Sequence, residues 1–133
     1  MNSQPATLDT LKLIQFLKRK PAEHKGNAGK VVLIGGAPGM AGALILAGNA
    51  CLHLGAGWTI LEMLDPISAR ADASQPELMI RLATLDIQES LTATKPDVIA
   101  IGPGLGKSEL ASCCLSAALS YPCLLYTSDA ADD

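Results

Sequence analysis

Short runs of aliphatic residues alternate along the chain with longer stretches in which apolar residues recur at helical spacing. A continuous apolar run is typical of a strand buried on both faces, and recurrence near 3.6 residues is typical of an amphipathic helix. Four runs predict strands: Val31–Ile34, Trp58–Leu64, Leu78–Leu82 and Asp97–Ile101. Four stretches predict helices: Leu8–Lys18, Ala41–Gly55, Asp86–Ala93 and Ser108–Leu119. This alternation predicts an α/β fold built on a parallel sheet.

Two glycine-rich loops follow predicted strands. Gly35–Met40 follows the first strand and Gly102–Gly106 follows the last. Ligands of parallel sheets bind beyond the carboxyl ends of the strands. Small residues ahead of a helix let backbone N–H groups approach an anion or a flat ligand. The sequence therefore predicts one cleft edge lined by both loops. The alternative for each loop is a tight turn that binds nothing.

Neither loop has the spacing of a well-known phosphate-binding motif. The first lacks the Lys-Ser/Thr end of a P-loop and fails the G-x-G-x-x-G pattern. The second ends in Gly106-Lys107-Ser108, but Ile101 stands where a P-loop requires its first glycine. No Ser/His/Asp or paired-carboxylate constellation identifies a catalytic centre.

Composition and charge argue against several classes of protein, namely nucleic-acid-binding, secreted and membrane-spanning proteins. The 133 residues are about the size of one small domain, and 49% of them are hydrophobic, which is enough for a core. A net charge of -3 argues against a protein that binds nucleic acid by neutralising phosphates. The chain does not start with a secretory signal, and its longest apolar stretch, Ala41–Leu54, is too short and too polar to span a bilayer. We expect a cytoplasmic protein with no membrane or nucleic-acid partner.

The four cysteines lack C-x-x-C spacing: Cys51, Cys113, Cys114 and Cys123. This pattern indicates reduced structural thiols rather than a metal or redox site, so we predict no metal site.

Four segments carry motifs that occur together, in this order, in one family. The first opens with His24-Lys25-Gly26 and runs through the first strand into the loop that ends at Gly42-Ala43. The others are Ala50–Gly57 (ACLHLGAG), Pro76–Met79 (PELM) and Asp97–Gly106 (DVIAIGPGLG). Together they resemble the ADP/ATP-dependent NAD(P)H-hydrate dehydratases, over about residues 8–122. Each motif alone is weak, but four in the family's order are specific.

The resemblance implies a ribokinase-like fold, a parallel sheet with helices on both faces. It implies repair of (S)-NADHX and NADPHX, in which the nicotinamide ring has taken up water. The family phosphorylates the added hydroxyl with ADP, or with ATP in some members, and Mg²⁺ is expected in the complete enzyme. Phosphate then leaves and the double bond returns. The resemblance also implies a fused or separate NAD(P)H-hydrate epimerase and a homo-oligomeric complete enzyme.

The same resemblance assigns site residues. Ala43 and Gly106 would contact the hydrate. Neighbouring residues of the two loops would shape the cleft: Gly36, Met40, Gly42, Gly102 and Gly104. The opening motif would lie near the site with no firm role: His24, Lys25 and Gly26. The family's catalytic Asp belongs to a Gly-Thr-Gly-Asp stretch that this chain lacks, so no catalytic residue is assigned.

The end of the chain departs from the family, which continues into an Asp-Ala-Asp strand, a His-bearing loop and a Lys-Gly segment. Residues 123–133 (CLLYTSDAADD) are similar to the translation of a transposon-end adapter used in DNA library preparation. We expect a lead-in helix in residues 1–20 and the N-terminal part of a dehydratase domain, truncated part-way, in residues 21–122. Residues 123–133 are then an artefact, and the alternative is a genuine short strand with an acidic tail.

Two other functions stay open. A small-molecule hydroxyl kinase of the ribokinase-like superfamily would accumulate phosphorylated product without elimination. The motifs His24-Lys25-Gly26 and Pro76–Met79 argue against it. A non-catalytic nucleotide-binding module would bind ADP or NADPH without turnover. Since a sheet cut midway exposes an apolar face, we expect this chain itself to be poorly soluble and inactive as a dehydratase.

Overall fold

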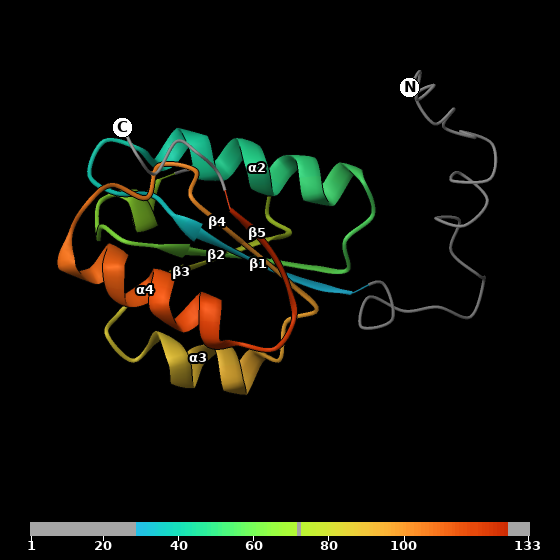
Figure 1. Cartoon of the computed structure of the whole chain (residues 1–133). Helices are drawn as coiled ribbons and strands as arrows, with labels where there is room; N and C mark the ends of the chain where they lie inside the picture. The colour runs from blue at the N-terminus through green and yellow to red at the C-terminus, as the bar shows by residue number, and fades with distance from the viewer. Residues whose placement is uncertain (1–28, 72, 128–133) are drawn as a thin grey trace, which may run out of the picture.

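The computed structural model describes residues 29–71 and 73–127 (Figure 1). Its strands are β1 Lys30–Gly35, β2 Trp58–Met63, β3 Leu78–Leu82, β4 Val98–Ile101 and β5 Leu124–Thr127. Its α-helices are α2 Ala41–His53, α3 Ile87–Thr94 and α4 Glu109–Ser120. A short 3-10 helix, η2, spans Ser68–Arg70.

The strands form one five-stranded sheet in the order β3-β2-β1-β4-β5, and every pairing is parallel. β1 lies at the centre, with Leu33 opposite Leu61 of β2 and Ala100 of β4. The parallel sheet predicted from the apolar runs is confirmed. A strand buried on both faces needs apolar side chains at successive positions, and this is what the runs supply.

Helices cover both faces of the sheet, as the resemblance implies (Figure 1). α2 packs on one face, where Leu44 joins Leu33 and Leu61 in a buried cluster. α3 and α4 pack on the other face, where Leu91 and Cys114 join the larger buried cluster. Among the described helices, none combines the length and apolar character needed to cross a bilayer.

The predicted elements agree with the structure to within about two residues at their ends. α2 ends at His53 rather than at Gly55, whose φ of +99° lies outside helical backbone. Ser108 caps α4 as its type suggests: its Oγ accepts a hydrogen bond from the Ala111 N–H at 3.0 Å. The predicted helix Leu8–Lys18 and the motif His24-Lys25-Gly26 lie outside the described residues.

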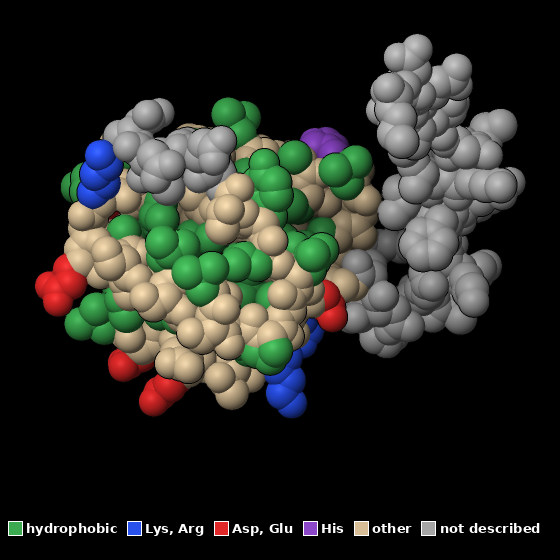
Figure 2. All heavy atoms as spheres, viewed as in Figure 1, with side chains coloured by type: hydrophobic (Ala, Val, Ile, Leu, Met, Phe, Trp, Pro, Cys, Tyr) green, Lys and Arg blue, Asp and Glu red, His purple; other side chains and the backbone are tan. Residues whose placement is uncertain are grey.

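The first part of the tail, Leu124–Thr127, forms β5 and pairs with β4. This is the short strand of the alternative interpretation, and the adapter origin of residues 123–133 stays a prediction. Leu125 packs against the core on the α4 side. Leu124 and Tyr126 alternate to the other face, where they are 70% and 65% exposed. Figure 2 shows hydrophobic side chains gathered across the middle of the viewed face, where β5 lies.

Candidate functional site

The two glycine loops lie side by side at the carboxyl edge of the sheet, because β1 and β4 are neighbours. The Ala37 N–H donates a hydrogen bond to the Gly104 carbonyl at 2.8 Å and so joins the loops directly. The Gly102 N–H donates to the Ile34 carbonyl at 3.3 Å, at the start of the second loop. The single edge lined by both loops, predicted from the sequence, is confirmed.

Several glycines of these loops are required by packing between chain segments. A Cβ on Gly104 would lie 2.7 Å from the Met40 carbonyl oxygen, and its φ is +66°. A Cβ on Gly35 would overlap the Pro103 carbonyl oxygen, and one on Gly36 would overlap the Met63 sulfur. These three glycines are therefore explained by close contact between segments, whether or not a ligand binds.

The start of α2 is the open part of this edge. Met40, at its N-terminus, is 45% exposed, and Gly42 and Ala43 of its first turn are exposed. The side chain of Met40, the N-cap residue, makes no capping hydrogen bond within the described residues, and the first turn has no acidic residue. An uncapped helix N-terminus presents backbone N–H groups and a partial positive charge, which together suit a phosphate or another anion.

The second loop contributes partly buried glycines to the same edge. Gly102 is buried and Gly104 and Gly106 are half-buried. Gly106 has a φ of +72°, and a Cβ there would lie 3.0 Å from the Cβ of Ala37 in the first loop. The two loops and the first turn of α2 thus bring all seven predicted cleft residues to one edge: Gly36, Met40, Gly42, Ala43, Gly102, Gly104 and Gly106.

A third segment, which the sequence analysis missed, supports the first loop from the β2 side. The Asp65 N–H donates to the Gly36 carbonyl at 3.2 Å, and the buried Ser68 hydroxyl donates to the Ala37 carbonyl at 3.2 Å. The Asp65 carboxylate accepts hydrogen bonds from the Ile67 and Ser68 N–H groups at 3.0 and 3.2 Å. Asp65-Pro66 was the available signal, since such a pair marks a turn held by its own side chain.

The two loops contain no ionisable side chain, so they can bind a ligand but cannot exchange a proton with it. Within residues 29–71 and 73–127, no three His, Cys, Asp or Glu side chains gather to hold a metal ion. The arrangement therefore suits recognition of a flat or anionic ligand rather than acid–base chemistry.

Comparison with known proteins identifies the family to which this edge belongs. The family model described as NAD(P)H-hydrate dehydratase matches residues 31–128, which include both loops. The chain belongs to this family. Over 99 residues it is 42% identical to the bifunctional NAD(P)H-hydrate repair enzyme Nnr of Escherichia coli. Over 104 residues it is 38% identical to the ADP-dependent (S)-NAD(P)H-hydrate dehydratase of Staphylococcus aureus.

A solved structure confirms the ribokinase-like fold implied by the resemblance. The chain superposes with a TM-score of 0.66 and 26% identity on the Bacillus subtilis ADP/ATP-dependent NAD(P)H-hydrate dehydratase, which was co-crystallised with ATP and Mg²⁺. This match covers 83% of the present chain and 40% of that protein. The matches to the two relatives cover 73% and 75% of the present chain, but 19% of the E. coli and 36% of the S. aureus protein. The chain thus spans only a part of these dehydratases.

Proposed function

We propose that this chain supplies the substrate-binding loops of an ADP-dependent dehydratase that returns (S)-NADHX and NADPHX to NADH and NADPH. One observation carries the proposal: in a chain of this family, the two glycine loops join at one sheet edge through the Ala37–Gly104 hydrogen bond. Ala43 and Gly106 then contact the hydrate. The uncapped start of α2 favours negative charge on a phosphate group.

The phosphoryl donor in this proposal is ADP or ATP. The S. aureus relative is named ADP-dependent, and the B. subtilis structure was obtained with ATP and Mg²⁺. Because the loops have no ionisable side chain, other residues must supply the catalytic base. The bifunctional E. coli relative supports an epimerase as a fused or separate partner. We place the complete enzyme in the cytoplasm as a homo-oligomer.

A chimera tests the proposal. The stretch of the S. aureus dehydratase that matches this chain is replaced by residues 29–122, and NADPH absorbance is followed after NADPH hydrate and ADP are added. We expect the chimera to restore NADPH and the 133-residue chain alone to restore none.

A matched pair of variants in the chimera tests the site. Ala43→Asp places a carboxylate in the first turn of α2, where it favours the helix but repels a phosphate. We expect at least about a hundredfold loss of turnover, the size seen when one transition-state contact is removed. Ala50→Asp makes the same change at an exposed position two turns along the helix and keeps most of the activity.

Other outcomes contradict the proposal. A folded chimera that accumulates a phosphorylated product without elimination identifies a hydroxyl kinase. One that binds ADP or NADPH without turnover identifies a nucleotide-binding module. Equal activity of the Ala43→Asp and Ala50→Asp chimeras removes the α2 N-terminus from the site.

A further inference from the structure

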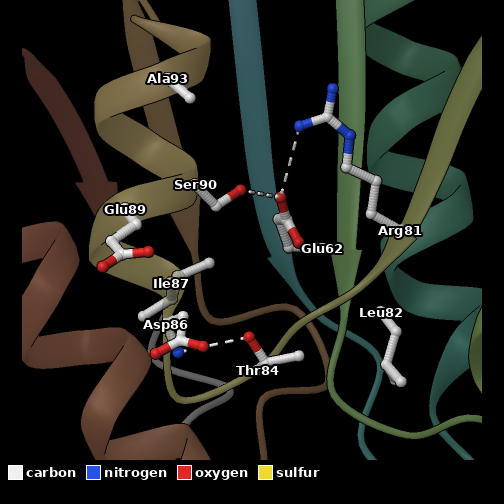
Figure 3. A pocket seen from close by; sticks show the side chains of 9 residues that line it. All are labelled: Glu62, Arg81, Leu82, Thr84, Asp86, Ile87, Glu89, Ser90 and Ala93. Carbon is white, nitrogen blue, oxygen red and sulfur yellow. Dashed lines mark hydrogen bonds and ion pairs between the residues drawn. The ribbon is translucent and has the colours of Figure 1, made fainter.

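A pocket of about 360 Å³ lies where β2 and β3 end against α3, and no residue of the glycine loops lines it (Figure 3). Its lining combines three carboxylates, one guanidinium, two hydroxyls and apolar side chains. The proposed dehydration makes no use of these residues. The proposed function therefore does not explain why these charged and polar side chains line a pocket.

The carboxylate of Glu62 is the unusual feature of this pocket. Glu62 is the last residue but one of β2, the strand between β1 and β3, and is 2% exposed. Its Oε1 accepts a hydrogen bond from the Ser90 hydroxyl at 3.1 Å and lies 3.9 Å from Nη1 of Arg81. In Figure 3 the other oxygen, Oε2, points away from both partners. Among the described residues, no side chain or backbone group pairs with Oε2.

The existing partners compensate the charge of Glu62 only in part. The Arg81 side chain is 43% exposed, and its Nη1 also donates to the Thr94 hydroxyl at 3.1 Å. Burial raises the pKa of Glu62, against the smaller opposing effects of the Ser90 hydrogen bond and the Arg81 charge. A carboxylate removed from water gains more from a close cation than an exposed one does. Glu62 can therefore accept a further positive group.

The remaining lining indicates what kind of cation fits. Asp86 and Glu89 add two carboxylates to the rim, so negative charge exceeds positive and an anion is disfavoured. In Figure 3 these two side chains point away from Glu62, and no metal cluster forms in the described residues. Ile87 and Ala93 of α3 supply apolar wall. This combination suits a charged group carried on a short apolar chain rather than a bare metal ion.

We propose that the pocket binds a small organic cation, with an ammonium group paired to Oε2 of Glu62 and an alkyl chain against Ile87. An ammonium group donates three hydrogen bonds and can satisfy the unpaired oxygen at short range. No residue of the two glycine loops or of the first turn of α2 lines the pocket, so its binding of a cation can be tested independently of the proposed function.

The test titrates the 133-residue chain with n-propylammonium, using n-propanol and propionate as neutral and anionic matches of the same size. Binding is followed on the ligand by NMR, which allows a dilute protein. We expect saturable binding of n-propylammonium, with n-propanol at least about tenfold weaker, the equivalent of losing about 1.4 kcal/mol of ion pairing. Propionate should not bind.

Two variants locate the site, and a third serves as a control. Glu62→Gln removes the charge and should weaken n-propylammonium at least about tenfold. Ala93→Phe fills the pocket from the exposed side of α3, leaves Glu62 in place and should abolish binding. Glu77→Gln removes an exposed carboxylate that does not line the pocket and should change the affinity by less than about threefold. Thermal melts confirm that each variant is folded.

Equal affinity of the parent chain, Glu62→Gln and Ala93→Phe for n-propylammonium overturns the proposal. Tighter binding of propionate overturns it too, because that result would make Arg81 the recognition group. If Glu62→Gln fails to fold, Ala93→Phe alone decides the outcome.

Discussion

Two adjacent cysteines of α4 differ in how deeply their side chains are buried. Cys114 faces the sheet from α4 and is fully buried, and burial raises its pKa to about 12, with smaller contributions from Cys113 and Glu62. Cys113 is half-buried, and its Sγ lies 3.6 Å from the Leu85 carbonyl oxygen. Since the thiolate is the reactive form, the two thiols should differ in reactivity.

Iodoacetamide at mildly alkaline pH should therefore alkylate Cys113 and spare Cys114 in the folded chain. Mass spectrometry of the peptide that contains both should find one adduct without denaturant and two with it. Two adducts on the folded chain would show that Cys114 is not enclosed as the structure has it.

Glu62 makes stability depend on pH. Because burial raises its pKa above the usual 4.5, the folded chain binds this proton more tightly than the unfolded chain. The protonated Glu62 carboxyl therefore contributes its full stabilisation below the usual pKa. This stabilisation is lost as the pH rises through the raised pKa of the folded chain. Glu62→Gln has no such titration. The free energy of unfolding of Glu62→Gln, relative to the parent chain, should rise from acidic to neutral pH.

Denaturant unfolding at a series of pH values measures this difference. Glu89→Gln is the matched control, since Glu89 is an exposed residue of α3 that also lines the pocket. A Glu62→Gln difference that stays constant or shrinks as pH rises would rule out the assigned role of burial.

Among the elements, the close contact between the two loops leaves no room for a side chain at Gly104. Alanine there would combine a φ of +66° with a Cβ 2.7 Å from the Met40 carbonyl and 2.8 Å from the Met40 Cβ. We expect Gly104→Ala to lower the free energy of unfolding by about 2 kcal/mol or more, from left-handed backbone strain plus steric overlap.

Gly42→Ala is the matched control for this loop variant. Gly42 lies in the first turn of α2, and a Cβ there has no atom within 4 Å. Because alanine favours a helix over glycine, stability should hold or rise by up to about 1 kcal/mol. Chemical unfolding of both variants measures the contrast, and equal effects would mean that the two loops do not touch.

Four strands, three helices and the single edge shared by the two loops could be predicted, but the side-chain contacts between elements could not. The run Val31–Ile34 marks β1 because a central parallel strand is apolar on both faces. The support that Ser68 gives to Ala37 joins residues 31 positions apart, and no local pattern encodes that distance. Glu62 likewise stands in an apolar run, and its partners Arg81 and Ser90 come from other elements. The local sequence predicts where strands and loops lie. Which side chains contact one another depends on how distant elements pack in the folded chain.

At the scale of the whole molecule, the sheet is covered unevenly. α2 contacts β1, β2 and β3 on its face of the sheet. On the same face β5 leaves Leu124 70% exposed and Tyr126 65% exposed. In the part of the chain that the structure describes, β5 is also an edge strand, paired with β4 alone. An exposed apolar face beside an open strand edge is a typical site of protein association.

We therefore expect the 133-residue chain to self-associate, in line with the poor solubility expected from its sequence. Replacing both Leu124 and Tyr126 with lysine should shift the chain toward monomer, because these side chains leave the core intact and charge on an edge strand opposes pairing. Leu54→Lys, at an equally exposed apolar residue after α2, is the control and should change little. Sedimentation velocity across a concentration series measures the difference. A parent chain that stays monomeric across the concentration series and unfolds in one sharp transition would contradict the prediction. That result would mean that the exposed apolar face of β5 does not drive self-association.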